Sequence, residues 1–102
     1  MNVTVLEDAL VDLADGYRFY EQQSGGLGIY FLDSLWSDID SLAFFGGIHP
    51  IYFEYHRLLS KRFPFAVFYR VTENDVQVRA ILDCRRNPAW IRKRMKYPEP
   101  AL

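Results

Sequence analysis

Residues 65–83 read FAVFYRVTENDVQVRAILD, and this stretch carries the clearest structural signal in the chain. Residues 65–71 are almost wholly apolar and rich in β-branched and aromatic side chains, as is typical of a central strand. The polar residues 72–75 are expected to form a hairpin turn. The return strand, 76–83, alternates, and the side chains predicted to lie against the helices are Val76, Val78, Ala80 and Leu82.

Two helices are predicted before this hairpin. The first follows Asp8, a candidate N-cap, and is expected to run to about Gln23, where a serine and two glycines stop it. The second restarts near Leu27 and continues to Gly46–Gly47. Its apolar stripe consists of Leu32, Leu35, Trp36, Ile39, Leu42 and Ala43. Two helices with a short joint are expected to form an antiparallel hairpin.

Three further elements complete the predicted fold. Residues 2–6 are expected to form a short strand and residues 52–62 a longer one, straight or bent. Asn87 is a candidate N-cap for a short basic helix from Pro88 to about Met95. The order β-α-α-β-β-β-α predicts an α+β fold with an antiparallel helical hairpin on one face of a small, mostly antiparallel sheet. We expect a single domain over residues 1–102, with an irregular tail from about residue 96.

The composition favours a cytoplasmic protein. Half of the 102 residues are hydrophobic, which is ample for one core. No run of about 18 apolar residues is present, and the N-terminus lacks the features of a signal peptide, so no membrane association is expected. Cys84 is the one cysteine and cannot form an intramolecular disulfide, which suits a reducing compartment. The predicted location is therefore the cytoplasm.

Charge is divided between the two halves of the chain. Residues 1–55 contain nine acids and one base, a balance of −8, whereas residues 56–102 contain eleven bases and four acids, a balance of +7. The two values sum to the net charge of −1. Such a split suggests that the second half meets an anionic partner, such as nucleic acid, nucleotide phosphate or an acidic protein. The alternative is that the two halves neutralise each other within the fold.

Strand alternation predicts where the basic side chains gather. With Val76 and Val78 against the helices, the polar residues of the three long strands are expected on the opposite, helix-free face of the sheet. This basic face is predicted to contain Arg57, Lys61, Arg70 and Arg79, with Arg85 and Arg86 at its rim. Clustered guanidinium groups suit phosphate oxygens, because their planar fork binds them in bidentate fashion. The alternative is an ordinary solvated sheet face.

Other residues carry weaker signals. Phe19 and Tyr30 lie off the apolar stripes of their helices, which predicts a surface for a protein partner. His49 and His56 are expected to be structural, and Cys84 is expected to be a buried small hydrophobe. The sequence contains no metal-ligand spacing, no nucleophile motif and no phosphate-binding glycine loop, so no metal or cofactor is expected.

Two segments resemble the RelE/ParE superfamily of toxins, the plasmid-stabilisation type of toxin–antitoxin system. Residues 57–71 resemble its basic strand followed by Phe-Pro-aromatic and aromatic-Tyr-Arg sequences, and residues 80–88 resemble a strand that closes in two basic residues before Asn-Pro. The first two helices of the family are similar to residues 9–32. The resemblance covers residues 3–94 and implies a cognate antitoxin that wraps the toxin in a hetero-oligomer.

The resemblance implies one of two activities. RelE-like members cut messenger RNA in the ribosome without a metal, using basic side chains and often a tyrosine, whereas ParE-like members poison DNA gyrase. Arg57, Lys61 and Arg86 match basic positions of the family. Ala66, however, stands where the ribonucleases carry an arginine on the middle strand. The C-terminal catalytic tyrosine has no secure equivalent: Trp90 lies nearby and Tyr97 comes late.

We therefore expect a toxin that arrests growth by poisoning DNA gyrase and is neutralised by a cognate antitoxin. Losing a transition-state arginine removes much of the charge stabilisation that RNA cleavage needs, which favours this reading. One alternative is a metal-independent, ribosome-dependent messenger RNA endoribonuclease. The other is a degenerate toxin that only binds its antitoxin. The residues predicted to bind the target or to act in catalysis are Arg57, Lys61, Arg70, Arg79, Arg85 and Arg86, and those predicted to bind the antitoxin are Phe19 and Tyr30.

Overall fold

A five-stranded sheet with helices on both sides forms the structure, a computed structural model that describes residues 1–96. Its strands lie in the order β1-β5-β4-β3-β2, with β1 parallel to β5 and the other pairs antiparallel. The elements are β1 (Asn2–Val5), α1 (Glu7–Gln23), α2 (Leu27–Asp40), α3 (Leu42–Phe45), β2 (Ile51–Tyr52), β3 (Tyr55–Leu59), β4 (Phe65–Thr72), β5 (Asp75–Asp83) and α4 (Pro88–Lys96). The predicted α+β fold is confirmed, and the predicted irregular tail lies outside the described residues.

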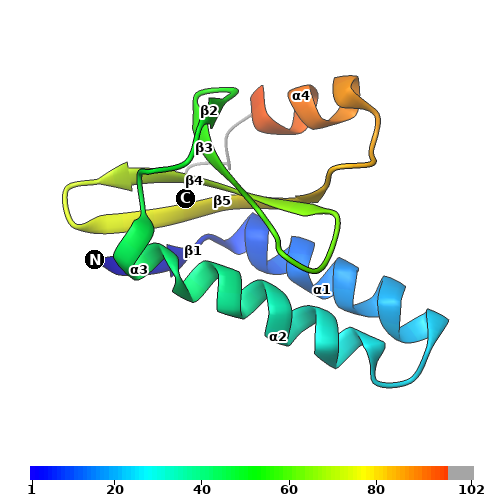
Figure 1. Cartoon of the computed structure of the whole chain (residues 1–102). Coiled ribbons are helices and arrows are strands. Elements are labelled where there is room, and N and C mark those ends of the chain that lie inside the picture. Colours follow the sequence, from blue (N-terminus) through cyan, green and yellow to red (C-terminus); the bar gives the residue numbers. More distant parts are fainter. Residues whose placement is uncertain (97–102) are drawn as a thin grey trace.

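The antiparallel hairpin of α1 and α2 covers one face of the sheet (Figure 1). The core between them contains Leu13, Phe31 and Ile39 from the helices and Val67 and Tyr69 from the sheet. The two helices approach closely at glycines: a Cβ on Gly16 would lie 2.4 Å from the Phe31 ring, and one on Gly28 would lie 2.8 Å from the carbonyl oxygen of Tyr17. Trp36, predicted in the apolar stripe, is instead 37% exposed. Within residues 1–96, no helix is both long and apolar enough to cross a membrane.

A β-bulge at Arg79 divides β5 into two halves. Tyr69 lies opposite Val78 and Phe68 lies opposite Ala80, so Arg79 has no residue opposite it. An extra residue reverses the alternation of the strand beyond it. Val76, Val78 and Ile81 therefore enter the core under the helical hairpin, whereas Ala80 and Leu82 belong to a second core on the other face. The prediction that Ala80 and Leu82 lie against the helical hairpin is wrong for this reason.

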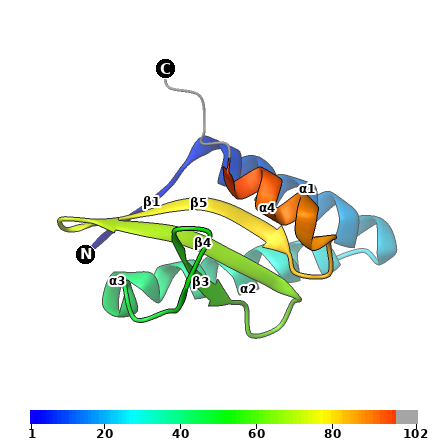
Figure 2. The same ribbon diagram turned by 90° about the horizontal axis from the view of Figure 1, so that it is seen from above.

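The second core is covered by α4 (Figure 2). Ile91 and Met95 of this helix pack on side chains from the three central strands, which are Tyr55, Ala66, Phe68, Ala80 and Leu82. The prediction of a helix-free face is therefore wrong, because the bulge turns two more apolar side chains onto that face and they require cover. The predicted start of the helix is confirmed: Asn87 Oδ1 accepts a hydrogen bond from the Ala89 N–H at 2.7 Å.

Two predicted segments are interrupted. The single strand expected over residues 52–62 is a hairpin of β2 and β3, whose turn residues Phe53 and Glu54 have φ of 56° and 70°. Such turns usually contain Asn-Gly or Asp-Gly, so Phe-Glu provides no sequence signal. The second helix breaks at Ser41, where the hydroxyl donates to the Asp38 carbonyl oxygen at 2.6 Å, and α3 follows. The first helix begins after Leu6, so Asp8 lies within it rather than at its N-cap.

Candidate functional site

Two of the predicted basic residues line one small cavity, which we call the basic pocket. It has a volume of about 210 Å³ and lies between the β2–β3 turn, the sheet and the start of α4. Arg57 projects from β3, with its guanidinium 3.8 Å from the centre of the Tyr52 ring, and its buried Nε has no hydrogen-bond partner among the described residues. Arg86 follows β5 and stacks on Trp90 at 4.1 Å. The pocket is lined by Tyr52, Phe53, Arg57, Ala66, Phe68, Leu82, Cys84, Arg86, Pro88 and Ile91.

The other predicted basic residues do not join this pocket. Arg70 is exposed on β4, with its guanidinium 4.5 Å from the centre of the Tyr55 ring. Lys61 is exposed in the loop after β3, because that strand ends at Leu59 and not at residue 62 as predicted. Neither residue is among those that line the basic pocket.

Arg79 and Arg85 are held by carboxylates. Arg79 is only 4% exposed, and its Nη1 lies 3.6 Å from Asp8 Oδ2, so the prediction of an exposed Arg79 is wrong. The bulge is the reason, since Arg79 is the residue that leaves the regular alternation. The Arg85 guanidinium donates from Nε and Nη2 to Asp83 at 3.0 and 2.7 Å. These hydrogen bonds raise the pKa of Arg85 and lower that of Asp83.

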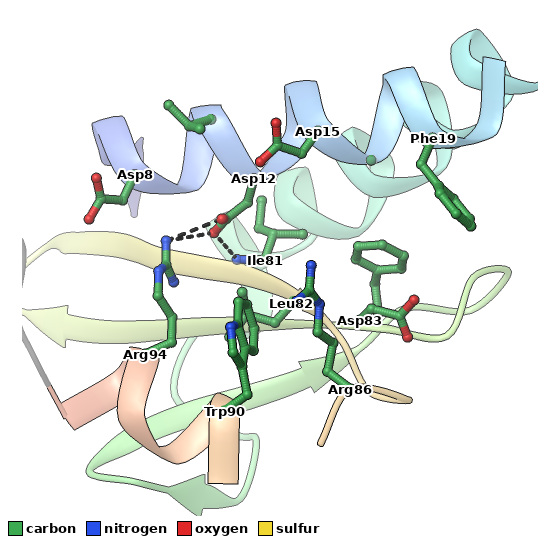
Figure 3. A pocket seen from close by; sticks show the side chains of 13 residues that line it. Asp8, Asp12, Asp15, Phe19, Ile81, Leu82, Asp83, Arg86, Trp90 and Arg94 are labelled. Atoms are coloured by element: carbon green, nitrogen blue, oxygen red, sulfur yellow. Dashed lines mark hydrogen bonds and ion pairs between the residues drawn. The ribbon is translucent and has the colours of Figure 1, made fainter. Parts of the chain in front are cut away.

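A larger cavity of about 530 Å³ lies between α1 and α4, and we call it the α1–α4 cleft (Figure 3). Asp12 and Arg94 meet across it: Asp12 Oδ2 accepts from Arg94 Nη2 at 3.0 Å and from the Ile81 N–H at 2.9 Å. Strand β1 pairs with β5 only as far as Val78. Beyond that point, the Ile81 N–H donates to the Asp12 carboxylate rather than to a carbonyl oxygen of β1. Burial raises the pKa of Asp12, against the lowering by these hydrogen bonds. Arg86 lines both cavities.

The two predicted partner-binding aromatic residues are both exposed. Phe19 is 51% exposed and lines the end of the α1–α4 cleft beyond Asp15, as Figure 3 shows. Tyr30 is 47% exposed on α2, where its ring packs on Phe63 at 5.4 Å. Their contact with a partner stays a prediction. The residue Cys84 is exposed as a whole, rather than buried as predicted. Its thiol lines the basic pocket, where partial desolvation raises its pKa.

The two histidines form a cluster with a tyrosine that sequence reasoning did not connect to them. His56 stacks on the buried Tyr69 ring at 5.0 Å, and its Nδ1 donates to the His49 carbonyl oxygen at 2.7 Å. The Tyr69 hydroxyl accepts the Gly47 N–H at 2.9 Å and also contacts His49 Nδ1. A hydroxyl can accept two hydrogen bonds and donate one, so the Tyr69 hydroxyl donates to His49 Nδ1 when that ring nitrogen is unprotonated. Burial, together with the charge of nearby His56, lowers the pKa of His49.

This cluster predicts a loss of stability in mild acid. With a folded pKa below the ordinary 6.5 of His49, the unfolded chain takes up the proton first as pH falls. The contribution of His49 to the free energy of unfolding is therefore complete above pH 6.5 and is lost as pH falls through the folded pKa. Urea midpoints measured from about pH 7.5 to 5 should fall over this window. The urea midpoint of His49→Gln should fall less steeply with decreasing pH than that of the natural chain. Equal slopes would contradict the lowered pKa of His49.

A comparison with solved structures identifies the architecture. One chain from the "Chromosomal ParDE TA system from P. aeruginosa" superposes with a TM-score of 0.70 over 79% of this chain and 92% of that chain, at 22% sequence identity. The fold is ParE-like. No protein-family model matches the sequence, and no curated protein matches it.

On this ParE-like fold, sequence reasoning found part of the candidate site. Arg57 and Arg86 were predicted, and the structure brings them to one pocket. Tyr52 and Trp90, which stack on these arginines, were not predicted as site residues, although aromatic residues near arginines in the sequence are a weak signal. Asp12 and Arg94 were also missed, because they are 82 positions apart in the chain. The described residues contain no group of three or more His, Cys, Asp or Glu side chains that could hold a metal ion.

Proposed function

We propose that this chain is the toxin of a type II toxin–antitoxin system and arrests growth by binding DNA gyrase in the cytoplasm. Its cognate antitoxin would neutralise it in a hetero-oligomer. The fold likeness to a chain of the ParDE TA system carries the proposal. The basic pocket supports it, because Arg57 and Arg86 each stack on an aromatic ring at an open cavity, an arrangement suited to docking on an anionic or macromolecular target.

The lining of the basic pocket favours binding over RNA cleavage. Metal-independent cleavage requires a group that removes the proton of the 2′-hydroxyl. Among residues 1–96, the lining contains no histidine and no carboxylate, and its titratable groups other than the arginines are Tyr52 and Cys84. The raised pKa of Cys84 makes its thiol a protonated group at neutral pH. Ala66 is also part of this lining, at the position where the resemblance expects an arginine in ribonucleases.

Alanine at both Arg57 and Arg86 is expected to relieve the growth arrest that follows expression of the chain without an antitoxin. Both guanidinium groups would be lost from the pocket, while the apolar core under α4 contains neither residue. Arg18→Ala is a matched control, because Arg18 is an exposed arginine of α1. Thermal melting of the purified variants checks that the fold is retained.

The same purified proteins separate the possible targets. The natural chain should inhibit DNA supercoiling by gyrase, and the double variant should not. Codon-linked messenger cleavage in a translation assay, without inhibition of gyrase, would replace the gyrase proposal with the RelE-like activity. Growth without arrest for the natural chain would leave only a degenerate toxin that binds its antitoxin.

A further inference from the structure

Four exposed apolar side chains follow one another along the edge of the molecule that contains α3 and β2. They are Phe44, Phe45, Ile48 and Ile51, and we call them the apolar edge. Their exposed fractions are 84%, 55%, 72% and 64%. Scattered apolar residues are common on protein surfaces, but these four lie within eight residues of sequence. Of the elements that carry the edge, α3 lies at the opposite end of the helical hairpin from the α1–α2 joint (Figure 1).

The backbone that carries these side chains is firmly attached to the rest of the fold. The N-terminal ammonium group donates to the Ala43 carbonyl oxygen at 3.0 Å, and Gly47 donates to Tyr69. The His56 ring holds the His49 carbonyl oxygen, and the Arg57 N–H donates to the Pro50 carbonyl oxygen at 2.8 Å. The apolar edge is therefore presented on a fixed backbone, which reduces the entropy lost when a partner binds.

The charge around the apolar edge indicates what kind of partner it fits. Residues 41–53 contain no aspartate, glutamate, lysine or arginine, although the chain is 25% charged. By contrast, the α1–α2 hairpin is acidic and α4 is basic. A strongly charged partner gains no electrostatic attraction at this edge. A second copy of the same surface, related by a two-fold axis, brings no charged side chain from residues 41–53, and the N-terminal ammonium group beside it is already bound to the Ala43 carbonyl oxygen.

The size of the apolar edge is consistent with such a dimer. With a side-chain area of about 200 Å² for phenylalanine and slightly less for isoleucine, the exposed fractions correspond to roughly 500 Å² per copy. Two copies would bury on the order of 1,000 Å², the lower limit for a specific interface. The strand β2 is also the last strand of the sheet, so its outer edge can face its symmetry mate.

We propose that two copies of this chain associate through the apolar edge as a weak, two-fold symmetric dimer. None of its four residues is among those that line the basic pocket, although Ile51 adjoins Tyr52, which does, and Phe19 and Tyr30 lie on α1 and α2. The dimer therefore does not depend on the proposed toxin function. At this interface size we expect a dissociation constant in the micromolar range.

Sedimentation equilibrium of the purified full chain tests the proposal, over roughly 1–200 μM. The average mass of the natural chain should rise from 12.0 kDa toward twice that value. Ile48→Lys should remain at the monomer mass over the whole range, because it inserts two like charges across the axis. Ile29→Lys is the matched control, since Ile29 is 53% exposed on α2 and should leave the dimer intact.

Three results would overturn the proposal. The natural chain could stay monomeric at every concentration, Ile29→Lys could abolish the dimer as completely as Ile48→Lys, or Ile48→Lys could still form dimers. Phe44→Lys provides a second variant at the most exposed position of the edge, and it should be monomeric too. Melting temperatures for all variants, measured at low concentration, establish that each one is folded.

Discussion

Replacing Asp12 by alanine is expected to lower the free energy of unfolding by about 2–4 kcal/mol. The carboxylate accepts hydrogen bonds from Arg94 on α4 and from the Ile81 N–H on β5, so its removal leaves both donors without this acceptor. The side chains of Asp12 and Arg94 are only 14% and 21% exposed, so water replaces the lost bonds poorly. Urea unfolding of the two proteins measures the difference.

Amide hydrogen exchange provides the specific readout for this change. The Ile81 N–H should exchange faster in Asp12→Ala, beyond what the lower global stability explains, because its acceptor has gone. Asp15→Ala is a matched control: Asp15 lies one turn further along α1 but is largely exposed and pairs only with Arg18 among the described residues. If Asp15→Ala lost as much free energy of unfolding as Asp12→Ala, the hydrogen bonds of Asp12 would not be the cause of the destabilisation.

The raised pKa of Asp12 has a separate consequence for pH. Because the folded pKa lies above the ordinary 3.8, the folded chain holds the proton in a range where the unfolded chain has released it. The contribution of Asp12 to stability therefore falls as pH rises from 3.8 through the folded pKa. Burial of the charge costs free energy, but removing the side chain costs more, because two buried donors then lose their acceptor.

Gly16→Ala is expected to destabilise the fold by about 1–3 kcal/mol, although alanine is the better helix former by about 1 kcal/mol. The added Cβ would lie 2.4 Å from Cζ of Phe31, whose ring is fully buried. That ring is enclosed by Tyr20, Phe63 and Phe65, with centroids about 5 Å away, so it cannot move aside freely. Thermal and urea unfolding should both report the loss.

Two further variants isolate the cause of this effect. Gly25→Ala adds a methyl group in open space at a glycine with ordinary backbone angles, so its stability should change little. Phe31→Leu shortens the side chain that Gly16 contacts, and in this background Gly16→Ala should cost less than in the natural chain. Equal costs in the two backgrounds would contradict the proposed clash.

The elements that could be predicted from the sequence have strong local signals. The hairpin of β4 and β5 was found because its two apolar runs flank four polar residues, and α4 was found because Asn87 and Pro88 mark its start. The helical hairpin was found from apolar spacing and the glycines after Gln23. The break at Ser41 and the turn at Phe53 were missed, because the hydrogen bond from the Ser41 hydroxyl interrupts a continuous apolar stripe and Phe-Glu is not a usual turn pair.

The candidate site was harder to predict because it depends on register. Alternation assigned Arg57 and Arg70 to the correct face of their strands, but it failed at Arg79, where the bulge intervenes. No glycine stands at or next to Arg79, so the sequence lacks the residue that most often marks a bulge. Lys61 was assigned to the cluster by the same alternation, which was continued past the end of β3 at Leu59, and Arg85 was placed at the rim after β5. Neither residue lines the pocket.

The bulge at Arg79 has a consequence for how relatives of this chain should be compared. Val76 and Val78 serve one core and Ala80 and Leu82 the other, yet all four are small or medium aliphatic residues that substitute for one another readily. A relative without the extra residue would align here with no loss of apparent similarity. Beyond the position of the bulge, however, each of its side chains would point to the other core than the aligned side chain of this chain. An alignment with a one-residue gap at position 79 would therefore match side chains that point to the same core, which an ungapped alignment of the apolar residues does not do.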